Sequence, residues 1–114
     1  LEIKRAEALL KEKIDLIVVD TAHGHTKKVA EIVKKIKKLK SKKTTLCAGN
    51  ISTIDAAKFL SKLGVDAIKV GIGPGSICTT RLVAGIGVPQ LSAIMAARKG
   101  LGKKKNYACR RWWN

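Results

Sequence analysis

The chain has 114 residues, 46% of them hydrophobic, and its 24 lysine and arginine residues against 8 acidic ones give a net charge of +16. This length allows one domain at most and excludes a large multidomain enzyme. No apolar run approaches the roughly 20 residues of a transmembrane helix. Residues 1–5 carry neither an initiator methionine nor a signal-peptide pattern, so we expect a piece of a longer protein without a membrane partner.

The predicted elements alternate between helix and strand. Apolar residues recurring at spacings of three and four predict helices over residues 2–12 and 27–40. Between them, an apolar and β-branched run over residues 14–19 predicts a strand that is covered on both faces and ends at Asp20. Lysines crowd the second helix and its exit, which indicates a solvated helix face or, alternatively, a surface that binds polyanions.

The same strand–helix unit then repeats along the chain. Residues 44–48 are predicted to form a strand whose exit loop begins at Gly49 and Asn50. The helix after it is capped by Ser52 or Thr53, runs to Leu63 and stops at Gly64. A third strand over 65–70 and a further helix over 91–98 follow.

Repeated strand–helix units predict an α/β fold with parallel strands. An open doubly wound sheet and part of a (β/α)8 barrel both fit this order. In both, chemistry is located in the loops at the carboxyl ends of the strands. We therefore expect Asp20, Asn50 and the loop that starts at Gly71 to converge in space.

The loop over residues 71–81 reads GIGPGSICTTR. Its glycines allow close approach of a ligand to the backbone, although a tight turn without a ligand is the alternative. The final glycine of a dinucleotide-binding G-x-G-x-x-G pattern is missing. Cys78 follows this turn and is the predicted nucleophile, because the charge of Arg81 would favour its thiolate. Cys47 lies within a predicted apolar strand and is expected to be inert.

Two further features concern metals and the cellular compartment. His23 and His25 lie two residues apart, but no third ligand is apparent, so we do not expect a zinc site. Three widely spaced cysteines, at positions 47, 78 and 109, are typical of a reducing cytoplasm and predict no disulfide framework.

Three motifs resemble the IMP dehydrogenase family, whose catalytic domain is a (β/α)8 barrel. They are DTAHGH (20–25), AGN (48–50) and KVGIGPGSICTTRLVAGIGVPQLSAI (69–94). The resemblance covers residues 1–97 and implies about the fourth to sixth units of a TIM barrel. GMP reductase is the near relative that shares the cysteine loop, but LVAGIGVPQ and DTAHGH favour the dehydrogenase. A GMP reductase piece and a non-catalytic basic binding module remain the alternatives.

The resemblance implies NAD-dependent oxidation of IMP to XMP, a step of guanine nucleotide synthesis. Cys78 would attack carbon 2 of the purine and form a thioimidate, and Thr80 would lie near the hydrolytic water. Ser76 would bind IMP. Asp20 would hold the nicotinamide ribose of NAD, with Asn50 nearby.

The resemblance also implies the remaining ligands of this loop and an assembly. Backbone atoms of Gly71, Ile72 and Gly73 would line the nicotinamide pocket. Carbonyl groups of Gly73, Gly75 and Cys78 would coordinate a potassium ion. The parent enzyme would be a cytoplasmic homotetramer, and a nucleic-acid partner is not expected.

Residues 98–114 leave the family pattern. They contain neither an apolar strand nor an Asp-Gly-Gly phosphate loop, and they are basic without any acidic residue. A reading-frame change or artificial terminus, an unstructured extension and a tail that stacks on nucleic acid are the alternatives. Because most of a barrel is missing, we expect this chain alone to be inactive.

Overall fold

The computed structural model describes residues 2–71, 90–103 and 107–110. Helices and strands alternate along them, as the sequence predicts. The helices are α1 (Glu2–Lys11), α2 (Lys27–Leu39), α3 (Ile54–Lys62) and α5 (Gln90–Leu101), and the strands are β1 (Leu16–Asp20), β2 (Thr45–Ile51), β3 (Ala67–Val70) and β4 (Tyr107–Arg110). None of the helices in these ranges is long and apolar enough to cross a lipid bilayer.

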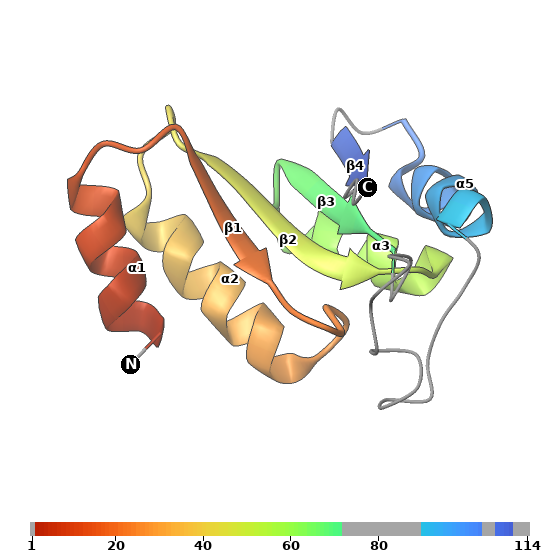
Figure 1. The fold of residues 1–114 in the computed structure, drawn as a ribbon, viewed down its shortest axis with the longest axis horizontal. Coiled ribbons are helices and arrows are strands. Elements are labelled where there is room, and N and C mark those ends of the chain that lie inside the picture. The colour runs from red at the N-terminus through yellow and green to blue at the C-terminus, as the bar shows by residue number, and fades with distance from the viewer. Residues whose placement is uncertain (1, 72–89, 104–106, 111–114) are drawn as a thin grey trace.

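The four strands form one parallel sheet in the order β1-β2-β3-β4, so each strand pairs with the next along the chain (Figure 1). The predicted α/β fold with parallel strands is therefore confirmed. Parallel neighbours need a crossover connection, and α2, α3 and α5 lie within the three crossovers.

One face of the sheet carries the hydrophobic core. Ile17 pairs with Leu46, and Val19 pairs with Ala48, which pairs in turn with Ile68. All five side chains are buried and share one cluster with buried residues of the four described helices. These helices therefore pack on the same face, whereas a doubly wound sheet carries helices on both.

The opposite face of β1 is open. Leu16 and Val18 alternate with the core residues of this strand and are 53% and 43% exposed. Asp20 continues the same alternation at the end of the strand. The polar residue at the strand end thus lies on the face that the described helices leave uncovered.

Local sequence signals set the helix boundaries. Of the two capping candidates for α3, the structure selects Thr53, whose hydroxyl accepts a hydrogen bond of 3.2 Å from the N–H of Ala56. Thr26 caps α2 in the same way, through the N–H of Val29. Gly64 has a φ of 85°, which confirms the predicted glycine stop after α3.

The sequence prediction differs from the structure at β2, which continues through Gly49 and Asn50 to Ile51 instead of ending at Ala48. Backbone pairing on both sides extends the strand. The N–H of Asn50 donates to the carbonyl of Thr21, and the N–H of Gly71 donates to the carbonyl of Ile51.

The structure adds a strand after residue 97, in a segment where the sequence shows no apolar strand. α5 continues to Leu101, and Tyr107–Arg110 forms β4 beside β3. Backbone pairing with the edge of β3 specifies this short strand without an apolar run.

The Thr53 cap provides a test of the fold. Replacing Thr53 with alanine removes the side-chain acceptor for the N–H of Ala56, and we expect the free energy of unfolding to fall by about 1 kcal/mol. Urea unfolding of the 114-residue chain measures the change. Thr53→Ser keeps the acceptor and serves as the matched control. Equal stability of the alanine and serine variants would contradict the assigned cap.

Candidate functional site

The carboxyl ends of the strands bring together polar groups that are distant in sequence. The side-chain amide of Asn50, near the end of β2, donates a hydrogen bond of 2.8 Å to the carbonyl of Gly71, which directly follows β3. Asp20 is the last residue of β1 and pairs with Gly49. The predicted convergence of Asp20, Asn50 and Gly71 at one edge of the sheet is therefore confirmed, while their ligand-binding roles stay predictions.

An ion pair that the sequence analysis missed lies across this edge. The Nζ of Lys69 is 2.6 Å from Oδ1 of Asp20, and the side chains are 12% and 49% exposed, respectively. These residues are on different strands and both pair with Gly49 of β2. The register of the strands could have predicted this contact, because residues that both pair with one residue of a central strand project to the same face.

Gly49 makes this ion pair possible. A Cβ atom at this position would lie 2.8 Å from the Cβ of Lys69 and would also collide with the Lys69 carbonyl oxygen. Cβ atoms in proteins do not approach other heavy atoms to less than 3.0 Å. The missing side chain at Gly49 therefore leaves the space across which Lys69 reaches Asp20.

The DTAHGH loop closes tightly over the end of β2. The hydroxyl of Thr21 donates to the carbonyl of Gly49 at 2.7 Å, and the N–H of Gly24 donates to the carbonyl of Asn50 at 2.6 Å. A side chain at Gly24 would approach Asn50 and Gly49 to about 3.0 Å. These contacts fix the backbone that follows Asp20.

Both histidines of this loop are exposed. The ring of His25 also packs against Phe59 of α3, with 4.5 Å between the ring centroids. Within residues 2–71, 90–103 and 107–110, no group of three potential metal ligands occurs.

Asn50 presents an acceptor at this edge. Its Oδ1 is buried and has no hydrogen-bond partner among the described residues, although its Nδ2 is satisfied by Gly71. A buried amide oxygen without a partner costs free energy. This oxygen is therefore placed to accept a hydrogen bond from a ligand or from the segment that follows Gly71.

Much of the predicted chemistry falls on residues outside the described ranges. Cys47 is inside β2 and only 4% exposed, as expected for a structural cysteine. The other predicted site residues lie within 72–89, which the structure does not describe. They are Ile72, Gly73, Gly75, Ser76, Cys78 and Thr80.

The contact at Gly49 gives a second prediction. In Gly49→Ala, the new Cβ must displace the Lys69 backbone, and we expect the free energy of unfolding to fall by roughly 1–3 kcal/mol, the usual cost of overpacking. Urea unfolding measures this change. Thr45→Ala, at an exposed position of the same strand, is the control and should retain the stability of the parent chain. An unchanged unfolding midpoint for Gly49→Ala would refute the assigned contact.

Comparisons with known proteins agree with this geometry. A family model described as the IMP dehydrogenase / GMP reductase domain matches residues 1–109. Inosine-5′-monophosphate dehydrogenase from Rhizobium tropici is 57% identical over 94 residues, which cover 82% of this chain and 19% of the relative. The enzyme of the same name from Rhodopirellula baltica is 50% identical over 105 residues, covering 92% of this chain and 19% of the relative. The chain thus spans about a fifth of the length of these relatives.

Solved structures show the same fold. The crystal structure of a GMP reductase variant from Trypanosoma brucei matches with a TM-score of 0.85 and 40% identity, covering 94% of this chain and 24% of that one. A second structure of this variant, in complex with guanosine 5′-monophosphate, matches with a TM-score of 0.80 and 43% identity over 88% of this chain and 21% of that one.

The family match continues past residue 97, where the sequence analysis placed a boundary; the origin of residues 98–114 stays a prediction. The resemblance drawn from the three motifs is confirmed by the family model and the curated relatives. The chain belongs to the IMP dehydrogenase / GMP reductase family.

Proposed function

We propose that the chain is part of the catalytic barrel of an enzyme that oxidises IMP to XMP with NAD⁺. The observation that carries this proposal is the convergence of Asp20, Asn50 and Gly71 at the carboxyl ends of three adjacent strands. Active sites of (β/α)8 barrels lie at this end of the strands. The relatives that are 57% and 50% identical to the chain, over 94 and 105 residues, carry the name of this dehydrogenase.

The arrangement of the sheet supports a barrel as the parent fold. Consecutive strands are neighbours, and the described helices cover one face only. In a barrel the helices form an outer ring and the other face of the sheet is the interior. β1, β2 and β3 would then be the fourth, fifth and sixth barrel strands, and β4 would follow them.

The chemistry proposed for the loop after Gly71 is nucleophilic catalysis. The thiolate of Cys78 adds to carbon 2 of the purine, and loss of hydride from this carbon leaves a thioimidate. Water then attacks the same carbon, with Thr80 nearby. The carbon–sulfur bond breaks, XMP is released, and the thiol returns to its starting state. Ser76 would hold IMP in this position.

The described residues fit the dinucleotide that this reaction requires. When bound, NAD⁺ would accept the hydride. The Asp20 carboxylate is about half exposed at the strand end, so ribose hydroxyls can reach it and donate hydrogen bonds to its oxygens. The buried Oδ1 of Asn50 is a second acceptor at the same edge.

The potassium ligands proposed from the resemblance are the carbonyl groups of Gly73, Gly75 and Cys78, which lie outside the described residues. The cytoplasmic homotetramer also stays a prediction.

GMP reductase is the second candidate, because the matched solved structures carry that name. Both activities would use the same cysteine loop. The segment LVAGIGVPQ and the motif DTAHGH favour the dehydrogenase, as does the identity to the curated relatives. The two candidates differ in the reaction of the nicotinamide cofactor: the dehydrogenase would form NADH, whereas the reductase would consume NADPH.

The structure weakens the third reading, a basic binding module. Some lysines of the 27–43 segment have structural roles. The Nζ of Lys40 donates to the carbonyl of Thr44 at 3.0 Å and lies 3.7 Å from a carboxylate oxygen of Asp66. The Lys37 side chain reaches to Gly64, at the end of α3. The basic segment therefore joins α2 to its neighbours as well as facing solvent.

A hybrid enzyme tests the proposed function. It is the Rhizobium tropici relative with its matched 94-residue segment replaced by the corresponding segment of this chain. We expect the hybrid to form NADH from IMP and NAD⁺, measured by absorbance at 340 nm, because the rim residues remain in their register. Consumption of NADPH with GMP, without NADH formation from IMP, would overturn the dehydrogenase assignment in favour of the reductase.

Two cysteine variants of the hybrid locate the nucleophile. Cys78→Ala should abolish NADH formation, because no thiolate remains to attack the purine. Cys47→Ala should keep the activity of the parent hybrid, since this cysteine is buried within β2. Loss of activity in the second variant, with retention in the first, would contradict the assigned roles.

The 114-residue chain alone should show no steady-state formation of NADH. It spans 19% of the length of the relatives, so most of the barrel of those relatives has no counterpart in it. The same absorbance assay measures this, with the hybrid enzyme as the positive control. Sustained NADH formation by the purified chain would show that one part of the barrel is sufficient.

A further inference from the structure

Lys69 places a positive charge where the fold does not require one. It lies on β3 between Ile68 and Val70, whose side chains are fully buried against the helices. Its own side chain is on the opposite face of the sheet and only 12% exposed. The other strands of a parent barrel can only cover this residue further. Because taking an ammonium group out of water costs free energy, an apolar side chain would serve the fold at least as well.

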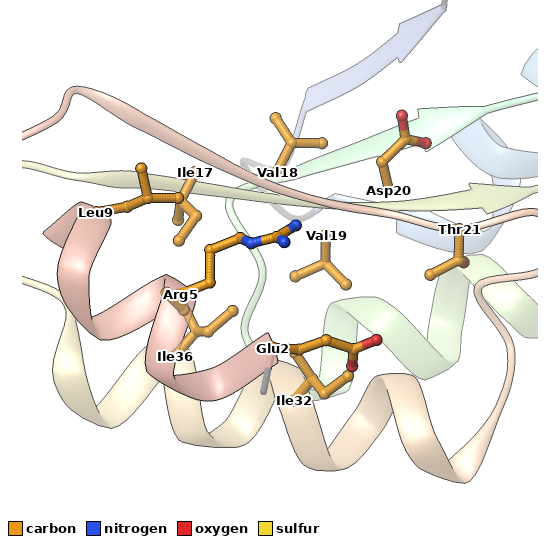
Figure 2. Close-up of a pocket in the computed structure, with 11 residues that line it drawn as sticks. Glu2, Arg5, Leu9, Ile17, Val18, Val19, Asp20, Thr21, Ile32 and Ile36 are labelled. Atoms are coloured by element: carbon orange, nitrogen blue, oxygen red, sulfur yellow. The ribbon is translucent and has the colours of Figure 1, made fainter.

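The counter-charge of Lys69 is Asp20, at the end of β1. The Nζ of Lys69 reaches across Gly49 of β2 and lies 2.6 Å from Oδ1 of Asp20. Figure 2 shows the Asp20 carboxylate on the same side of β1 as Val18, whereas Val19 points to the opposite side, towards the helices. The pair therefore lies on the face of the sheet that the hydrophobic core does not use.

The backbone and the side chain of Asp20 are held by different groups. The N–H and the hydroxyl of Thr21 both donate to the carbonyl of Gly49, at 2.9 and 2.7 Å, and they fix the backbone that follows Asp20. The ammonium group of Lys69 holds the carboxylate itself. A side chain that is already held in one orientation loses less conformational entropy when it binds a ligand.

A second lysine–aspartate pair in the same sheet has a structural role. The Nζ of Lys40 lies 3.7 Å from Oδ2 of Asp66, and the two side chains are again 12% and 49% exposed. Both partners also bind the backbone, since Lys40 donates to the carbonyl of Thr44 and Asp66 accepts from the N–H of Leu46. This pair joins α2 to the amino ends of β2 and β3, whereas the first pair lies at the carboxyl ends, where barrel enzymes carry their chemistry.

We propose that Lys69 is a positioning residue whose ammonium group holds the Asp20 carboxylate in the orientation that accepts hydrogen bonds from a ribose of the nicotinamide dinucleotide. This inference rests on the proposed function, which supplies the ligand. Lys69 acts through Asp20 and not by touching the ligand. Loss of the ammonium group should therefore weaken dinucleotide binding, and it should have no further effect once the carboxylate is gone.

Calorimetric titration of NAD⁺ into the hybrid enzyme measures this effect without depending on turnover. Lys69→Met keeps an unbranched side chain and removes the charge, and we expect the Kd for NAD⁺ to rise about tenfold, the scale of one lost charge-assisted contact. The KM for NAD⁺ should rise in parallel, whereas kcat and the KM for IMP should change by less than about twofold.

Lys40→Met is the matched control. It removes a lysine of the same exposed fraction from the pair at the other end of the strands. The Kd for NAD⁺ should stay within about twofold of the parent hybrid, because distant sites act independently. Equal weakening of NAD⁺ binding by Lys40→Met and Lys69→Met would show that Lys69 has only a structural role, and it would refute the proposal.

A double variant separates positioning from direct contact with the ligand. Asp20→Asn should raise the Kd for NAD⁺ at least as much as Lys69→Met does, and its side-chain oxygen still accepts from the ammonium group, which keeps the variant folded. Asp20→Asn combined with Lys69→Met should bind NAD⁺ as Asp20→Asn alone does, because the ammonium group acts only through the carboxylate. A further tenfold loss in the double variant would overturn the proposal.

The outcomes also distinguish this inference from the proposed function. An unchanged Kd in Lys69→Met, in a hybrid that forms NADH from IMP, would refute the positioning role and leave the function standing. The expected rise in Kd, in a hybrid that forms no NADH, would support the positioning role and overturn the proposed reaction. A parent hybrid that binds no NAD⁺ would overturn both.

Discussion

The ion pair between Asp20 and Lys69 depends on the absence of a side chain at Gly49. These three residues lie side by side on β1, β2 and β3, and a Cβ on the central one would collide with Lys69. The parallel register therefore places the half-exposed carboxylate of Asp20 against the nearly buried ammonium group of Lys69. This contact lies at the strand ends, on the face that no described helix covers.

The two faces of the sheet separate the hydrophobic core from the candidate site. One face buries the hydrophobic side chains of three strands against four helices, and it supplies the core. The other face carries the Asp20–Lys69 pair, with Asn50 and Gly71 joined by a hydrogen bond at the same edge. In barrel enzymes, residues at the carboxyl ends of the strands carry the chemistry, and they can vary without loss of the hydrophobic core. Membership of the IMP dehydrogenase / GMP reductase family agrees with this division.

Periodicity and capping signals predicted α1, α2 and α3 closely, because an apolar stripe and a threonine or glycine boundary are local properties of the sequence. The end of β2 and the existence of β4 were not predicted, because both depend on backbone pairing with distant strands. Lys69 was missed for the same reason: its partner is 49 residues away, and only the register brings the two together. Asp20 and Asn50 were predicted as site residues because the motifs that contain them resemble the family. Their positions at strand ends predicted only that they would lie close together.

The central claim is that Asp20, Gly49 and Lys69, which pair across three strands, form one side of a nucleotide site that also includes the loop after Gly71. A crystal structure of the hybrid enzyme with IMP bound tests it most directly. The account predicts the sulfur of Cys78 next to carbon 2 of the purine, on the same face of the sheet as the Asp20–Lys69 contact. A nucleotide bound on the helical face, or Lys69 turned away from Asp20 with the site still filled, would contradict it.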